Sequence, residues 1–81
     1  MYLVYILYSD KIDKYYVGFT QDLAKRFVRH LQSGKGFTSR AKDWKVVYQE
    51  FYDTKIEAYS REREIKQWKS RKKIEELIHN Q

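Results

Sequence analysis

The chain contains no cysteine and no proline, and its only glycines are at positions 18, 34 and 36. The absence of cysteine excludes disulfide bonds, thiolate zinc sites and thiol nucleophiles. A chain with so little glycine and proline does not belong to the low-complexity or disordered classes. No apolar run approaches the roughly 20 residues of a membrane helix, and the first eight residues lack the basic leader of a signal peptide. We therefore expect a cytoplasmic protein that does not associate with a membrane.

Positive charge and aromatic side chains are abundant. The 81 residues include 17 lysines and arginines against 11 aspartates and glutamates, which gives a net charge of +6. There are 8 tyrosines, 4 phenylalanines and 2 tryptophans, and 42% of the residues are hydrophobic. This composition predicts one small domain over residues 1–81, with enough apolar side chains for a compact core.

The basic residues gather in two stretches of the chain. Residues 25–45 contain a single acidic residue, Asp43, whereas residues 61–73 contain seven basic and two acidic residues. The basic residues of the first stretch are Lys25, Arg26, Arg29, Lys35, Arg40, Lys42 and Lys45. Basic clusters interleaved with aromatic side chains favour binding to a nucleic acid. The charged residues could instead serve only to keep the protein soluble, so charge alone does not identify a function.

Two β-rich runs at the start of the chain predict a hairpin. Residues 1–8 and 15–19 are rich in tyrosine and branched aliphatic side chains, and a polar turn separates them. Asp10 and Asp13 lie in that turn, and turn formation explains them more simply than a metal-binding loop does.

The register of this hairpin decides whether its tyrosines share a face of the sheet. Antiparallel pairing holds the sum of paired residue numbers constant. An odd sum near 23 places Tyr5 and Leu7 on the same face as Tyr16 and Gly18, whereas an even sum separates the tyrosines. The residues themselves leave both registers open.

Capping residues and periodicity predict the other elements. Thr20 is suited to cap a helix in which Leu23 and later apolar residues recur at helical spacing up to Gly34. A strand over residues 45–52 precedes Thr54, which opens a capping box and a helix that runs to about residue 69. Ser70 can cap a final helix. The predicted order is β-β-α-β-α-α, an α+β fold with a three-stranded antiparallel sheet flanked by helices.

Glu62 and His30 are the candidate chemical groups outside the hairpin. Glu62 follows Ala58 by four residues, on the side of its helix expected to face the sheet, where a carboxylate must be paired or bind a metal. The simpler alternative is an ion pair with Lys66 at the helical i, i+4 spacing. His30 lies one helical turn from Arg26, and a lone helical histidine is more often a packing residue than a catalyst. Two histidines without cysteine provide no zinc-ligand set.

The order of these residues resembles the GIY-YIG nuclease superfamily. Val4-Tyr5-Ile6 and Tyr16-Val17-Gly18 are similar to the paired motif that names it, with valine in place of the first glycine and of the second isoleucine. Residues 22–30 resemble the family helix with its arginine and histidine, and residues 57–62 resemble the helix that presents a metal-binding glutamate. The likeness spans nearly the whole chain and is greatest to small, stand-alone bacterial members.

The resemblance implies a role for each matching residue. Tyr5 and Tyr16 would line the active face and orient or activate the attacking water, and Glu62 would hold one divalent ion, Mg²⁺ or Mn²⁺. Arg26 would stabilise charge on the scissile phosphate, and His30 would assist proton transfer or form a hydrogen bond with a tyrosine. We expect the nucleic acid to contact Gly18, Lys25, Arg29, Lys35, Arg40 and Lys66. Many members carry an asparagine a turn or more beyond the metal-binding glutamate. It has no match here, because the only asparagine, Asn80, lies near the end of the chain.

The resemblance thus implies a metal-dependent endonuclease that cleaves DNA, including branched or damaged forms in repair or recombination. A first alternative is a nucleic-acid-binding module of the same fold with little activity of its own. A second alternative is a protein-interaction domain in which the charge provides solubility. The sequence shows no appended DNA-binding domain, so we also expect weak selectivity, a protein partner or a homodimer.

Overall fold

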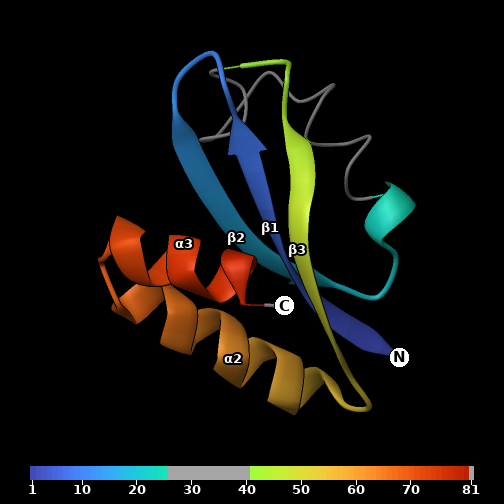
Figure 1. Ribbon diagram of the computed structural model, residues 1–81. Helices are drawn as coiled ribbons and strands as arrows, with labels where there is room; N and C mark the ends of the chain where they lie inside the picture. Colours follow the sequence, from blue (N-terminus) through green and yellow to red (C-terminus); the bar gives the residue numbers. More distant parts are fainter. Residues whose placement is uncertain (26–40, 81) are drawn as a thin grey trace.

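A computed structural model describes residues 1–25 and 41–80 of the chain (Figure 1). It confirms the order β-β-α-β-α-α; the first helix is described over residues 23–25. The other elements are β1 (Tyr2–Ser9), β2 (Lys14–Thr20), β3 (Lys45–Tyr52), α2 (Lys55–Gln67) and α3 (Arg71–His79). None of the helices described here has the length and apolar character needed to cross a bilayer.

The hairpin of β1 and β2 has the odd register. Tyr5 pairs with Gly18 and Leu7 pairs with Tyr16, so the sum of paired residue numbers is 23. Asp13, at the end of the turn, has a positive φ of 55°, a left-handed conformation that aspartate tolerates better than most residues. The two candidate tyrosines therefore lie on the same face of the sheet.

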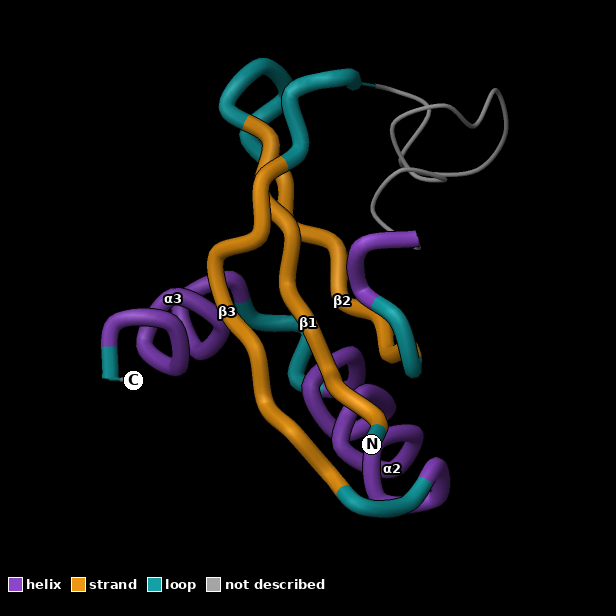
Figure 2. Tube along the Cα trace, turned by 90° about the vertical axis from the view of Figure 1, so that its right-hand side faces the viewer, coloured by secondary structure: helices purple, strands orange, loops and turns teal. Residues whose placement is uncertain are grey.

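The sheet has the order β2-β1-β3, with both neighbours antiparallel to the central strand (Figures 1 and 2). Alternate residues of β1 face two apolar clusters. Val4 and Ile6 pack with Ala58 and Ile65, so α2 and α3 cover this face. The opposite face holds Leu3, Tyr5 and Leu7 together with Ala41 and Trp44. A bulge between β1 and β3 at Ile6/Leu7 shifts their register by one residue.

Side-chain caps fix the helix ends. Thr54 accepts a hydrogen bond from the Glu57 amide (3.2 Å) and Ser70 accepts one from the Lys73 amide (3.3 Å), as predicted. At the first helix the cap is Asp22 rather than Thr20, because Asp22 Oδ1 accepts the amide of Lys25 at 3.2 Å. Thr20 is instead the last residue of β2.

The helix α2 ends at Gln67, slightly earlier than expected. Lys69 then adopts a φ of 49°, which turns the chain sharply toward α3. This elbow directs α3 back along the same face of the sheet as α2 (Figure 2).

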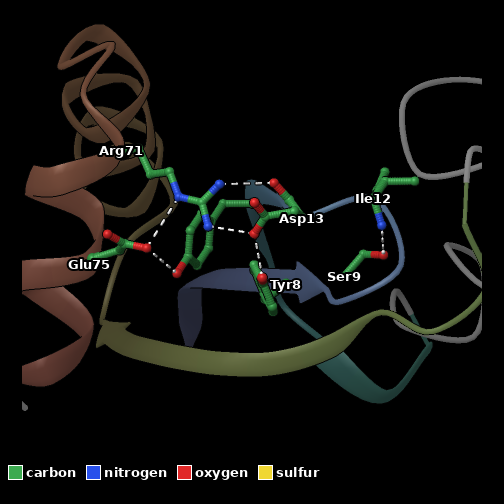
Figure 3. A network of polar contacts seen from close by, with 7 residues as sticks. Tyr8, Ser9, Ile12, Asp13, Arg71 and Glu75 are labelled. Atoms are coloured by element: carbon green, nitrogen blue, oxygen red, sulfur yellow. Dashed lines mark hydrogen bonds and ion pairs between the residues drawn. The ribbon is translucent and has the colours of Figure 1, made fainter.

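An arginine network joins α3 to the hairpin turn (Figure 3). Arg71 donates to the carbonyl (3.0 Å) and carboxylate (2.5 Å) of Asp13 and to Glu75 (3.2 Å). Tyr8 also donates to Asp13, and Tyr15 donates to Glu75. Hydrogen bonds from Arg71 and Tyr8 lower the pKa of Asp13 from 3.8 to about 2.

A second arginine network joins β3 to α2. Arg61 binds the Glu50 carboxylate with two nitrogens, at 2.9 and 3.1 Å, and Tyr48 and Tyr52 donate to the same carboxylate. Burial and the hydrogen bond to Glu50 raise the pKa of Tyr48 and of Tyr52 to about 12. Burial opposes ionisation of Glu50, but the bonds from Arg61 and the tyrosines lower its pKa nevertheless.

Candidate functional site

The two candidate tyrosines are neighbours across the hairpin. The centroids of Tyr5 and Tyr16 are 6.5 Å apart and their planes are tilted by 39°. Tyr5, on the central strand, is completely buried, whereas Tyr16, on the edge strand β2, is half-buried. Of the pair, Tyr16 is therefore the phenol that solvent and a ligand can reach.

Gly18 makes room for Tyr5. A Cβ atom built on Gly18 would lie 2.5 Å from the Tyr5 hydroxyl oxygen and 2.7 Å from Cζ of the same ring. Both distances are far below van der Waals contact, so a side chain at position 18 would displace the tyrosine. This crowding explains the glycine, and contact of Gly18 with a substrate stays a prediction.

Glu62 and Lys66 form an ion pair on α2. The Lys66 Nζ atom is 3.3 Å from Glu62 Oε1, at the i, i+4 spacing. The glutamate side chain is only 12% exposed, whereas the lysine is 49% exposed. Both features considered from the sequence are thus present: the carboxylate is largely buried, and Lys66 is its partner.

Lys66 also connects Glu62 to Tyr16. Its Nζ atom lies 5.8 Å from the centroid of the Tyr16 ring, within the range of a cation–π contact. One lysine therefore contacts both the candidate metal ligand on α2 and the accessible tyrosine on β2. Lys66 is a flexible, half-exposed cation, so it can leave either group without disturbing the core.

Glu62 opens into a hollow of about 310 Å³ on the surface of α2. Tyr59, Arg63 and Lys69 line this hollow together with Glu62 and Lys66. Arg63 donates to the Tyr59 hydroxyl at 3.0 Å and lies 5.6 Å from its ring centroid. Because basic side chains surround a single carboxylate, an anion can approach the glutamate closely.

Several predicted site residues lie outside the described part of the chain. These are Arg26, Arg29, His30, Lys35 and Arg40. Lys25 is described and exposed, in the first turn of the helix capped by Asp22. Among the described site residues, Tyr5 adjoins Tyr16, Tyr16 lies near Lys66, and Lys66 pairs with Glu62, while Tyr5 itself packs on the face of the sheet opposite α2.

Of the described residues that line the hollow on α2, Glu62 is the one carboxylate that could take part in holding a divalent ion. Within residues 1–25 and 41–80, no three His, Asp or Glu side chains are grouped for metal binding. Magnesium commonly retains several waters and takes one or two carboxylates together with phosphate oxygens. One carboxylate could supply such a ligand once Lys66, which now pairs with it, moves away. Glu62 is the residue that would hold the ion.

Sequence reasoning missed the two arginine networks and Tyr59. Tyr48, Glu50 and Tyr52 alternate along β3, and this period of two places them on one face of the strand. That alternation was a readable signal for a polar cluster. The partners Arg61 and Arg71 had no local signal, because tertiary packing brings them to the strands.

Comparisons with known proteins show which sequences this chain resembles. The family model described as the GIY-YIG catalytic domain matches residues 1–75. A UPF0213 protein of Staphylococcus saprophyticus is 41% identical over 61 residues, covering 73% of each chain. A UPF0213 protein of Cupriavidus necator is 46% identical over 63 residues, covering 75% of this chain and 67% of its own. No solved structure matches.

Proposed function

The chain belongs to the GIY-YIG family of nuclease domains, and we propose that it is a metal-dependent endonuclease that hydrolyses phosphodiester bonds in DNA. The observation that carries the proposal is the meeting of Tyr16 and Glu62 through Lys66, beside Tyr5. Hydrolysis of a phosphodiester requires positive charge where the transition state gathers negative charge. The basic surroundings of Glu62 support this requirement.

In this proposal the accessible Tyr16 hydroxyl orients the attacking water, and Tyr5 supports the ring of Tyr16 from the central strand. Arg26 neutralises charge on the scissile phosphate, and His30 assists proton transfer. Glu62 holds one divalent ion, Mg²⁺ or Mn²⁺, which when bound withdraws electron density from a phosphate oxygen. Tyrosine has an ordinary pKa of about 10, so loss of its proton near neutral pH requires these cations close by.

Lys66 has two successive roles in the proposal. Before a substrate binds, its ammonium group neutralises Glu62, which limits the cost of keeping that carboxylate largely buried. With a divalent ion held by Glu62, Lys66 would instead contact a phosphate of the bound strand. Its half-exposed position and flexible stem allow this movement.

The proposed substrates include branched or damaged DNA, with a role in repair or recombination. Gly18, Lys25, Arg29, Lys35, Arg40 and Lys66 form the proposed contact surface. We also propose that the protein acts in the cytoplasm. Added selectivity would come from a protein partner or a second copy of the chain.

A nucleic-acid-binding module with little activity is the second candidate. The Glu62–Lys66 ion pair favours it, because a lysine already occupies the carboxylate that would hold the metal. The two candidates differ in one property. The module binds DNA in a strongly salt-dependent way and cleaves none with any divalent ion.

The deciding experiment measures cleavage of labelled single-stranded, duplex and branched DNA with Mg²⁺ or Mn²⁺. We expect metal-dependent cleavage by the wild type and a loss of at least about 100-fold in Glu62→Ala. Glu76→Ala, which removes an exposed carboxylate of α3 outside the hollow, is the matched control. Wild-type cleavage by Glu62→Ala would refute the endonuclease assignment, and binding without cleavage would favour the module.

A further inference from the structure

A second hollow adjoins the candidate site on the other side of Lys66. It has a volume of about 420 Å³ and lies between β2 and the elbow that joins α2 to α3. Lys66 and Lys69 line both this hollow and the one that contains Glu62. Tyr16 is part of its wall. The two hollows therefore form adjacent parts of one surface, with Lys66 at their junction.

The floor of this second hollow is apolar. Val17 and Ile65 are buried core residues, and Ile74 of α3 is partly buried beside them. Tyr15 and Tyr16 contribute aromatic side chains from the edge strand. A pocket of a few hundred cubic ångströms with an apolar floor is of the size that binds small organic groups.

The rim is basic. Lys14, Lys66, Lys69 and Arg71 line the hollow, and none of its lining residues is acidic. Asp13 and Glu75 already balance the charge of Arg71, and Glu62 balances that of Lys66. Within the described parts of the chain, no carboxylate forms an ion pair with Lys14 or Lys69. Lys14 interacts electrostatically with the adjacent Asp13, but neither ammonium group is held in an ion pair with a described residue, so both can contact an anionic ligand.

We propose that this hollow is a subsite for one unstacked nucleotide, next to the scissile phosphate of the bound strand. The inference rests on the proposed function and extends it. The base would lie on the floor of Val17, Ile65 and Ile74, and its phosphates would contact Lys14 and Lys69. An apolar floor beneath a basic rim complements a nucleobase joined to a phosphate.

The subsite selects a class of substrate. A base paired and stacked within a continuous duplex cannot enter a pocket unless it is first extruded, which costs a few kcal/mol. A nucleotide in a single strand, gap or flap avoids most of that cost. The protein therefore prefers DNA that carries unpaired nucleotides.

Binding measured without metal tests the subsite separately from cleavage. The probes are a short duplex and the same duplex with a single-stranded gap, and the protein carries Glu62→Gln. We expect about tenfold tighter binding to the gapped probe. Lys14→Gln combined with Lys69→Asn should remove that preference, and asparagine tolerates the positive φ of Lys69.

The matched control combines Lys55→Gln with Lys72→Gln. It removes the same charge from α2 and α3 but does not alter the lining of the hollow. We expect this control to weaken binding to both probes equally and to retain the preference for the gap. Equal loss of the preference in both double variants, or no preference in the starting protein, would overturn the subsite.

Methyl NMR tests the subsite independently, because it requires no substitution of the lysines at the rim of the hollow. In methyl NMR spectra, the gapped probe should shift the signals of Val17, Ile65 and Ile74, and the continuous duplex should not. Unshifted methyls would refute the subsite, whatever the variants do. A protein that shows the shifts but cuts no DNA with Mg²⁺ or Mn²⁺ would refute the endonuclease alone. Cleavage without the shifts would refute the subsite alone.

Discussion

Glu50 and Glu62 are both largely buried carboxylates, with side chains 18% and 12% exposed, and each receives a cation from α2. Glu50 accepts bonds from two nitrogens of Arg61 and from two tyrosines. Among the described residues, Glu62 has one ion-pair partner, a flexible lysine. The two carboxylates are thus similarly buried, but Glu50 has many more hydrogen-bond partners than Glu62.

The difference separates a structural carboxylate from one that can bind a ligand. A planar guanidinium and two phenols occupy most of the lone pairs of Glu50 in fixed positions. Glu62 retains lone pairs that Lys66 does not use, and Lys66 can move away. A largely enclosed carboxylate whose lone pairs a ligand can still reach is a candidate functional group.

The largest expected effect tests the structural side of this comparison. Arg61→Ala leaves Glu50 buried without its cation, and we expect the free energy of unfolding to fall by about 2–3 kcal/mol in urea denaturation. Arg63→Ala, on the same helix, should cost less than about 0.5 kcal/mol because Arg63 has an exposed partner. Similar losses in the two variants would contradict a structural role specific to the Glu50 network.

The packing of Tyr5 provides the next test. Gly18→Ala places a methyl group 2.5 Å from the Tyr5 hydroxyl, and we expect a loss of about 1–3 kcal/mol in unfolding free energy. Tyr5→Phe combined with Gly18→Ala should recover part of this loss, because the closest atom is removed. If the alanine costs the same in both backgrounds, the clash is not the cause.

A smaller effect is expected at Glu62. Lys66→Met removes the competing ammonium group and keeps the apolar stem, so the affinity for Mn²⁺ should rise by about three- to tenfold. Titration followed by calorimetry or by the electron spin resonance of Mn²⁺ measures this affinity. Lys72→Met removes the same charge outside the hollow. An equal rise in both variants would mean that net charge alone is responsible.

The smallest effect concerns pH. The pKa of Asp13 is about 2 in the folded protein, below its ordinary value of 3.8, so the unfolded chain binds more protons between these values. The stability due to Asp13 is present above pH 4 and is lost as the pH falls toward 2. Asparagine tolerates the positive φ of this position. In Asp13→Asn, the free energy of unfolding should therefore fall less steeply as the pH is lowered from 4 to 2. An unchanged slope would count against this account.

Local signals in the sequence predicted much of the fold. Thr54 and Ser70 were identified from capping patterns that act within one helical turn, and the structure confirms them. The hairpin register remained open because both registers bury apolar side chains; the odd one pairs Tyr5 with Gly18. The sequence favours Thr20 as the cap, but Asp22, two residues later, can equally accept a hydrogen bond from a backbone amide and is the cap in the structure.

The candidate site was less predictable from local pattern. The proximity of Lys66 to both Glu62 and Tyr16 depends on where α2 lies against β2, and no spacing along the chain encodes it. The resemblance to a nuclease family supplied Tyr5, Tyr16 and Glu62 as candidates. In the structure Tyr16 adjoins Tyr5, and Lys66 links Tyr16 to Glu62, but Tyr5 packs on the face of the sheet opposite α2. The hollow at the elbow required the left-handed Lys69, which no feature of the sequence had indicated.

The strand order β2-β1-β3 has a consequence for how the protein is made. The central strand is the first to be synthesised, and it can pair at once with β2 across a short turn. Its other neighbour arrives much later, because Tyr2 pairs with Tyr52. Closing so long a segment is slow compared with forming a hairpin, so β3 should join the sheet last. Until then, a growing chain on the ribosome exposes one edge of its most apolar strand, and this interval is when it is most prone to aggregate.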